Sequence, residues 1–132
     1  YEGQLRDVCR DNGVGVIGYF SLASGFLTGK YRSQSDLADR ARGAFVEHLL
    51  TPHNFRILDA VEDVAGEVHA TMAQVVLAWL MAQPTITAPI ASATRVSQLE
   101  ELMAAMDVTL SADQIARLDD ASALALAADG GA

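Results

Sequence analysis

The sequence predicts an α/β fold in which parallel strands are connected by helices. Two short apolar runs are the main evidence for strands: "VGVIGYF" at residues 14–20 and "TITAPIAS" at residues 85–92. The first run has no alternating polar residues, which is typical of a strand covered on both faces in a parallel sheet. Helical patterns precede, separate and follow the two runs, and strands that alternate with helices indicate β-α-β units.

The first helix is predicted over Gln4–Arg10, where apolar residues recur at i, i+3 and i+4. Asn12 and Gly13 suit its C-terminus because both residue types tolerate a positive φ. After the first strand we expect a loop at residues 21–30. The polar segment at residues 31–50 is compatible with either a short helix or a surface excursion.

Two helices between the strands have clear start signals. Thr51 and Pro52 have the residue types of an N-cap and a first helical position. Thr71-x-x-Gln74 matches a capping box, which opens a second helix at residues 72–82. This second helix is apolar almost all round, so we expect it to be deeply buried.

Two further helices are expected after the second strand. Thr94 is predicted as the N-cap of the first, and Ser111-x-x-Gln114 is another capping box that opens the second. The first of these helices carries an apolar stripe that we expect to face the core, comprising Leu99, Leu102, Met103 and Met106. After about residue 125 we expect a poorly ordered tail.

The composition is that of one globular domain, with 132 residues, 51% hydrophobic and 20% charged. The net charge of −8 argues against nucleic-acid binding, because phosphate backbones need a basic face. No apolar stretch reaches the about 18 residues of a membrane span. Cys9 is the lone cysteine, which excludes an internal disulfide and favours a reducing compartment, so we expect a cytoplasmic protein.

The small number of predicted strands bears on the size of the whole protein. Two parallel strands cannot cover their own faces and edges. We therefore expect the chain to be a fragment of a longer protein or the ordered part of one. Exposed strand edges also pair with other strands, so self-association is a further expectation.

The loop after the first strand contains Gly25, Gly29 and Lys30, the one lysine in the chain. Glycines let backbone N–H groups approach phosphate oxygens, and a lysine supplies positive charge. The segment matches neither the Walker motif nor the GxGxxG motif. Two interpretations therefore remain open, an anion-binding loop and an ordinary surface loop. Two interpretations are likewise open for the basic residues of this region: they form the basic edge of an anion site, or they lie on a solvated face with ion pairs. These residues are Lys30, Arg32, Arg40 and Arg42.

The second strand runs out through the small residues 91–93 into a predicted helix start. Helix N-terminal amides and the helix dipole favour an anion there. Arg95 adds a cationic donor in the first turn, where a cation is otherwise unfavourable to the helix. The two open interpretations are an anion site and an exposed arginine. Glu101 follows on nearly the same helical face as Arg95 and Gln98.

The titratable and hydroxyl side chains form no recognisable metal site or nucleophile arrangement. His48, His53 and His69 have no metal-ligand spacing with one another, with Cys or with carboxylates, and Ser21 and Ser24 have no identifiable base partner. We therefore assign no catalytic and no metal-binding residue in this chain.

Two stretches closely resemble the aldo-keto reductase family. The first is "GVGVIGYFSLASGFLTGKY", which is similar to the family segment built around Tyr-Ser-Pro-Leu-Ala-x-Gly-x-Leu-Thr-Gly-Lys-Tyr, and the second runs from Ala70 to Ser122 and is similar to the family's ending. The resemblance implies that residues 1–132 are the C-terminal part of a single (α/β)8 TIM-type barrel domain. This part contains about the last two β/α units and an extra C-terminal helix.

The resemblance also implies a binding site for NADP(H). In the family, an aromatic residue that stacks on nicotinamide corresponds to Tyr19. The positions on the pyrophosphate side correspond to Leu22, Ala23, Ser24, Gly25 and Lys30. The positions on the side of the adenosine 2′-phosphate and adenine correspond to Ser92, Thr94, Arg95, Gln98 and Glu101. The chain departs from the family pattern at Phe20-Ser21 (usually Ser-Pro), Ser92 (usually Gly) and Leu102 (usually Asn).

The resemblance implies an activity for the complete protein, which is the reduction of aldehydes or ketones to alcohols. The family's catalytic tetrad of Asp, Tyr, Lys and His lies on early strands, with Tyr as the proton donor. Those segments are not in this chain, so we expect it to be inactive alone. A small-molecule carbonyl compound is the expected substrate of the complete protein. The alternative is a truncated, non-catalytic module that binds a nucleotide or a partner.

Overall fold

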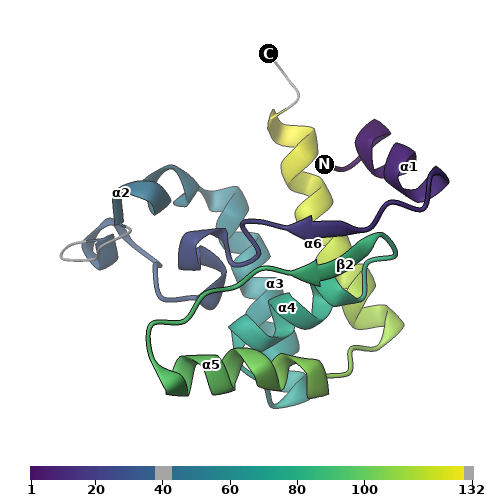
Figure 1. The fold of residues 1–132 in the computed structure, drawn as a ribbon. Coiled ribbons are helices and arrows are strands. Elements are labelled where there is room, and N and C mark those ends of the chain that lie inside the picture. Colours follow the sequence, from purple (N-terminus) through teal and green to yellow (C-terminus); the bar gives the residue numbers. More distant parts are fainter. Residues whose placement is uncertain (38–42, 130–132) are drawn as a thin grey trace.

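The computed structural model describes residues 1–37 and 43–129, and a parallel pair of short strands lies near its centre. Strand β1 (Val16–Gly18) pairs with β2 (Ile86–Pro89), with Gly18 opposite Pro89. The Ile90 N–H donates to the Gly18 carbonyl over 2.9 Å, which extends the pairing past the end of β2. Both strands end at the same edge, and the segments that follow them leave on the same side in Figure 1. The prediction of parallel strands is confirmed.

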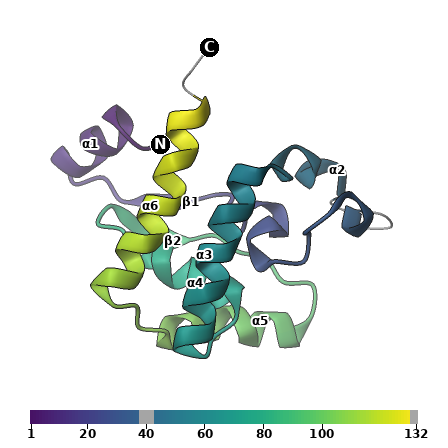
Figure 2. The ribbon, with the colours of Figure 1, turned by 180° about the vertical axis from the view of Figure 1, so that it is seen from behind.

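Helices α3 (Pro52–Val68), α4 (Met72–Met81) and α6 (Ala112–Asp129) form a layer on one side of the sheet. The strands lie in front of this layer in Figure 1 and behind it in Figure 2. The facing sides of these helices share a buried cluster that comprises Val61, Val64, Ala65, Val75, Val76 and Leu118. Burial of an aliphatic side chain of this size is worth about 1.5–3 kcal/mol, so this cluster stabilises the packing of the three helices against one another.

Within residues 1–37 and 43–129, no single helix is both long and apolar enough to cross a membrane. Helices α3 and α4 are long and apolar enough only when they are taken together, and this pair is bent by 95°.

The starts of α3 and α4 follow the predicted capping patterns. Thr51 Oγ1 accepts the Asn54 N–H over 3.1 Å, and Pro52 is the first residue of α3. At α4 the Gln74 N–H donates to Thr71 Oγ1 over 3.3 Å, and the Thr71 N–H donates to Gln74 Oε1 over 2.9 Å. Both predicted starts are confirmed, because these caps satisfy helix-end donors locally. The predicted burial of α4 is also confirmed, since Val75, Val76 and Leu77 are buried.

The opposite face of the sheet is open. Ile17 in β1 is 59% exposed, whereas Val16 and Gly18 are half-buried. The prediction that this strand is covered on both faces is therefore wrong for the described chain. The physical reason is that the helix layer covers one face, and a two-stranded sheet has no second layer to cover the other.

Helix α1 (Gln4–Asp11) lies apart from the helix layer in Figure 1 and contains no buried residue. Its apolar residues Leu5 and Val8 are exposed. After the helix, Gly13 takes the positive φ of 64°, whereas Asn12 has a φ of −104°. The predicted helix is confirmed, and its apolar face is left without cover by the described chain.

The chain between β1 and α3 is an excursion of short turns. Its elements are the 3-10 turns η1 (Ala23–Thr28), η2 (Gln34–Leu37) and η3 (Glu47–Leu49) and the one-turn helix α2 (Gly43–Val46). Phe26, Tyr31 and Val46 fold back onto Leu58 of α3 in a second buried cluster. Both interpretations of residues 31–50 hold in part: the described residues contain the short helix α2, and the turns around it form an excursion that is anchored by the buried Tyr31 and Val46.

Helix α5 (Val96–Met103) differs from the prediction at its start and in its packing. Its N-cap is Arg95 and not Thr94, and no side chain caps the helix there. The apolar stripe does not face the core, because Leu99, Met103 and Met106 are exposed. The helix lies at the edge of the molecule, where Ala105 in the following 3-10 turn η4 (Ala104–Asp107) is the buried residue.

Helix α6 begins with the predicted capping box. The Ser111 N–H donates to Gln114 Oε1 over 2.9 Å, and the Gln114 N–H donates to Ser111 Oγ over 3.2 Å. The helical backbone continues to Asp129. The poorly ordered tail after about residue 125 stays a prediction, and residues 130–132 lie outside the described residues.

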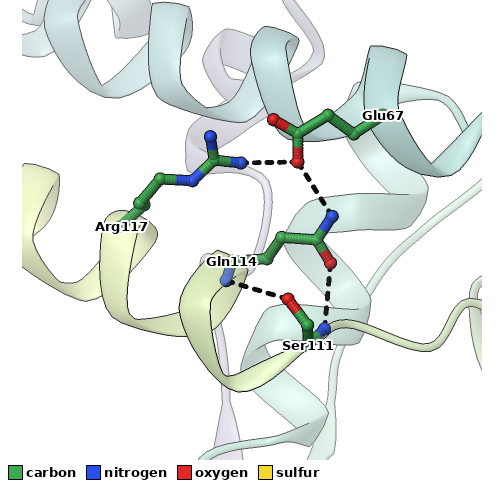
Figure 3. A network of polar contacts seen from close by, with 4 residues as sticks. All are labelled: Glu67, Ser111, Gln114 and Arg117. Atoms are coloured by element: carbon green, nitrogen blue, oxygen red, sulfur yellow. Dashed lines mark hydrogen bonds and ion pairs between the residues drawn. The ribbon is translucent and has the colours of Figure 1, made fainter.

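A polar network ties α6 to α3 (Figure 3). Gln114 Nε2 and Arg117 Nη2 both donate to Glu67 Oε2, over 2.9 Å and 2.7 Å. The hydrogen bonds from Gln114 and then Arg117 hold the pKa of Glu67 below its ordinary value. The same glutamine therefore caps α6 and connects it to α3.

This lowered pKa predicts a pH dependence of stability. The stabilising contribution of Glu67 is present above the ordinary carboxyl pKa of 4.5 and is lost as the pH falls through the lower pKa of the folded chain. We expect the melting temperature of Glu67→Gln to fall less on acidification than that of the wild type. Circular dichroism melts at neutral and acidic pH measure this, with the exposed Glu100→Gln as a control. Equal acid sensitivity in wild type and Glu67→Gln would contradict the expectation.

Candidate functional site

The segment after β1 turns back toward the strand that it leaves. Ser21 is buried, and its hydroxyl donates to the Gly18 carbonyl over 3.1 Å. Tyr19 and Phe20 point outward: Tyr19 is 74% exposed, and the two rings are T-shaped with centroids 4.5 Å apart. A serine hydroxyl therefore closes the end of the strand, and an aromatic ring at the position predicted to stack on nicotinamide is accessible.

Three consecutive residues after this turn have left-handed backbone conformations. The φ angles are 47° at Ala23, 57° at Ser24 and 93° at Gly25. For a residue with a Cβ this conformation costs about 1–2 kcal/mol, a cost that glycine avoids. Strained backbone of this kind clusters at ligand sites. Sequence reasoning had no signal for it, because Ala and Ser ordinarily avoid this region.

Lys30 extends across this strained turn. Its Nζ lies 5.0 Å from the centre of the Tyr31 ring. A Cβ built on Gly25 would lie 2.7 Å from Lys30 Nζ and 2.8 Å from Cε, so the lysine occupies space that a side chain at Gly25 would fill. Lys30 forms no ion pair with a carboxylate in the described part of the chain. Its charge is therefore available to an anion.

The segment after β2 is organised by two glutamines. Gln98 Oε1 accepts both the N–H and the Oγ1 hydroxyl of Thr94, each over 3.0 Å, which holds the turn that leads into α5. Gln74 Nε2 donates to the Glu101 carbonyl over 3.0 Å, which ties α5 to α4. Arg95 is exposed, and within the described residues it forms no ion pair.

A pocket of about 590 Å³ lies between the two segments, and we call it the loop–helix pocket. The predicted site residues that line it are Tyr19, Leu22, Ser24, Gly25, Lys30, Ser92, Gln98 and Glu101. Its volume is in the range of small-molecule sites. Three predicted residues do not line it: Ala23 packs on the second buried cluster, and Thr94 and Arg95 are exposed in the turn before α5. The structure therefore brings together parts of both predicted segments.

Half of the residues around the loop–helix pocket were not predicted as site residues, although Phe20, Ser21 and Leu102 were noted as departures from the family pattern. They comprise Phe20, Ser21, Thr28, Phe45, Ala73, Ile90, Ala91 and Leu102. Phe45 comes from α2, and Ala73 comes from the first turn of α4. No sequence pattern links Phe45 and Ala73 to the loop after β1, because tertiary packing alone brings them to it. Their apolar side chains give the pocket a partly hydrophobic wall.

The basic residues after β1 do not all face this pocket. Arg32 donates to Asp59 over 2.9 Å and to Glu62 over 2.6 Å, and both carboxylates belong to α3. Arg32 is thus part of a solvated face with local ion pairs, whereas Arg40 and Arg42 lie outside the described residues. In the described ranges, no group of three or more His, Cys, Asp or Glu side chains is arranged to hold a metal ion.

A pocket at the carboxyl ends of parallel strands, flanked by helices, is the ligand-site arrangement of TIM-type α/β barrels. The sequence model of the Aldo/keto reductase family matches residues 2–123. The chain belongs to this family.

Individual relatives agree with the family match. The chain is 32% identical over 123 residues to L-glyceraldehyde 3-phosphate reductase of Escherichia coli O157:H7, covering 87% of this chain and 35% of that protein. It is 33% identical over 110 residues to the Schizosaccharomyces pombe aldo-keto reductase yakc, whose name includes NADP(+). This match covers 81% of this chain and 32% of that protein.

A solved structure supports the same fold. The crystal structure of a thermostable aldo-keto reductase with the inhibitor epalrestat matches with a TM-score of 0.62 at 26% identity, covering 89% of this chain and 33% of that chain. The chain therefore has a TIM-barrel-type α/β fold. It spans about a third of the length of the relatives that it matches.

Proposed function

We propose that the chain is the C-terminal, cofactor-binding part of an NADP(H)-dependent aldo-keto reductase that reduces aldehydes or ketones to alcohols. The observation that carries the proposal is the loop–helix pocket, which joins the two segments that the family resemblance assigns to the cofactor. Family membership supports an oxidoreductase function. The name of the S. pombe relative supports NADP(H). A small carbonyl compound is the proposed substrate of the complete protein.

The residues around the pocket fit a dinucleotide that carries phosphates. Among the described residues, no carboxylate forms an ion pair with Lys30. Lys30 also lies next to a turn in which Gly25 has no side chain. Such a positive charge beside such a turn suits the pyrophosphate. Arg95, which is the N-cap of α5 and lies outside the pocket lining, suits the 2′-phosphate. The accessible ring of Tyr19 suits stacking on nicotinamide. When bound, the cofactor supplies the hydride of the reduction.

We further propose that the chain alone has no catalytic activity. Reduction of a carbonyl needs a proton donor beside the oxygen that forms the alcohol. Tyr31 is 2% exposed and packs in the second buried cluster, which removes it from contact with a substrate. Tyr19 and Lys30 are proposed for cofactor binding. The donor and its partners are therefore assigned to the part of the barrel that this chain does not contain.

Titration of the purified chain with NADPH and NADH, followed by an assay for carbonyl-dependent NADPH oxidation, tests both proposals. We expect NADPH to bind more tightly than NADH, because Arg95 offers a partner for the 2′-phosphate, and we expect no turnover. Failure to bind NADPH would overturn the cofactor proposal and favour a module that binds only a partner. Turnover by the chain alone would overturn the proposal that it is inactive.

Two further expectations stay proposals. The exposed face of β1, with Ile17 at its centre, and the free strand edges support self-association of the isolated chain. A cytoplasmic location is supported by the single cysteine, Cys9, which forms no disulfide within the chain.

A further inference from the structure

We propose that Gln74 is a positioning residue for the loop–helix pocket, because its side-chain amide couples the start of α4 to α5 and so holds Gln98 and Glu101 where they face the bound nucleotide. This inference rests on the proposed function, since the nucleotide is NADP(H). Gln74 itself does not line the pocket. It would therefore act through the residues that do.

Both ends of the Gln74 amide are used. Its Oε1 accepts the Thr71 N–H over 2.9 Å, and its Nε2 donates to the Glu101 carbonyl over 3.0 Å. The amide group is planar, so occupying both ends restricts its orientation. The preceding residue, Ala73, lines the pocket, as does Glu101 on the other side of the bond. One half-buried side chain therefore joins two walls of the same pocket.

The Glu101 carbonyl is a suitable acceptor because of its place in the backbone. Helix α5 ends at Met103 and passes directly into the 3-10 turn η4. At such a transition the backbone changes from i+4 to i+3 hydrogen bonding, which leaves a carbonyl in need of another donor. The Gln74 amide supplies a donor at this point.

Apolar packing contributes little to the attachment of α5. Val96, Leu99 and Met103 are all exposed, and no residue of α5 is fully buried. An element with few buried apolar contacts opens easily unless polar contacts hold it. The hydrogen bond from Gln74 therefore has a larger share in fixing α5 than the same bond would have in a well-packed helix.

Gln114 offers a matched control within the same chain. It too occupies the third position of a capping box and accepts the N–H of its N-cap residue, Ser111, over 2.9 Å. Its Nε2 also donates to a second element, at Glu67 over 2.9 Å. Gln114 lies away from the loop–helix pocket. Replacing either glutamine by methionine removes the acceptor for the N-cap N–H and the donor to a second element without changing the charge; the second acceptor is a backbone carbonyl for Gln74 and a carboxylate for Gln114.

The test compares the wild-type chain with Gln74→Met, Gln114→Met and Gln74→Glu by melting temperature, NADPH titration and amide hydrogen exchange. We expect both methionine variants to melt at lower temperature, but only Gln74→Met to weaken NADPH binding, by about two- to tenfold. We expect its hydrogen exchange to rise in α5 and not in α6. Gln74→Glu keeps the acceptor for Thr71 and loses the donor to Glu101. It should regain the part of the melting temperature that the cap on Thr71 supplies, but not NADPH affinity, including at high salt, which screens the added charge.

The outcomes separate this inference from the proposed function. If the wild-type chain binds NADPH and Gln74→Met binds it equally well, the positioning role is overturned and the proposed function stands. If Gln114→Met weakens NADPH binding as much as Gln74→Met does, the effect is general destabilisation and the inference is again overturned. If the wild-type chain does not bind NADPH, the proposed function fails and the positioning role fails with it. Unchanged hydrogen exchange in α5 of Gln74→Met would overturn the coupling between α4 and α5 independently of any nucleotide.

Discussion

Leu118→Ala is expected to lower the free energy of unfolding by about 2–5 kcal/mol, because it removes a buried side chain and leaves a cavity. Leu118 is fully buried and joins α6 to the cluster that α3 and α4 share. A loss of this size is a large fraction of the stability of a typical domain, which is about 5–15 kcal/mol. Urea unfolding followed by far-ultraviolet circular dichroism measures the change.

The matched control for this experiment is Leu99→Ala. Leu99 is 52% exposed on α5, so the same deletion removes little packing there. Alanine is also the better helix former. We expect a change within about 0.5 kcal/mol, as for most surface substitutions. If the two variants lost equal stability, the assignment of Leu118 to the core between α3, α4 and α6 would be wrong.

Arg95→Ala is expected to weaken NADPH binding by about tenfold or more, because a charge-assisted hydrogen bond to phosphate is worth more than a neutral one. The effect on NADH should be small, because NADH has no 2′-phosphate for the guanidinium to contact. Lys30→Ala should instead weaken NADPH and NADH alike, because both dinucleotides carry the pyrophosphate. Fluorescence titration with the two cofactors measures the four effects.

Arg6→Ala is the control for this pair of variants. Arg6 is an exposed arginine on α1, so its replacement makes the same change in net charge away from the pocket. Its NADPH affinity should match that of the wild type. If Arg95→Ala left the NADPH affinity unchanged, Arg95 would not be the residue that binds the 2′-phosphate. A Lys30→Ala chain that loses NADPH but not NADH would contradict the assignment of Lys30 to the pyrophosphate.

The parts of the fold that were predicted correctly have local causes. Thr51, Thr71 and Ser111 cap the helices that follow them, and each side chain accepts a hydrogen bond from a residue three positions later. A sequence contains all the information for such a contact, because both partners lie within one turn. The prediction of Thr94 as the N-cap of α5 was wrong. The Thr94 N–H donates to the Gln98 side chain, and the N-cap is Arg95.

Burial was predicted less well than helix position. The stripe on α5 has the spacing of a core-facing helix, yet Leu99 and Met103 are exposed. The apolar run at β1 has the composition of a strand covered on both faces, yet Ile17 is exposed. In both cases the pattern records which side of an element prefers an apolar neighbour. Whether that neighbour is present depends on elements far away in the sequence.

The same distinction applies to the candidate site. The glycine-containing loop that ends in Lys30 and the helix start at Arg95 were each found from their residue types, and each was open to an ordinary structural interpretation. The pocket between them could not be found in this way, because Phe45 and Ala73 reach it from α2 and α4. Neither could the bond from Gln74 to Glu101, which joins residues 27 positions apart.

By itself, the sequence determined the helix starts, the parallel α/β arrangement and the resemblance to the aldo-keto reductases, because capping contacts and linear motifs depend on residues close together in the chain. The tertiary structure alone decided which face of the sheet is covered, that the stripe on α5 is exposed, and that Phe45 and Ala73 line the same pocket as Lys30, whereas Arg32 pairs with α3. These outcomes depend on which distant elements pack together, and no local pattern contains that information.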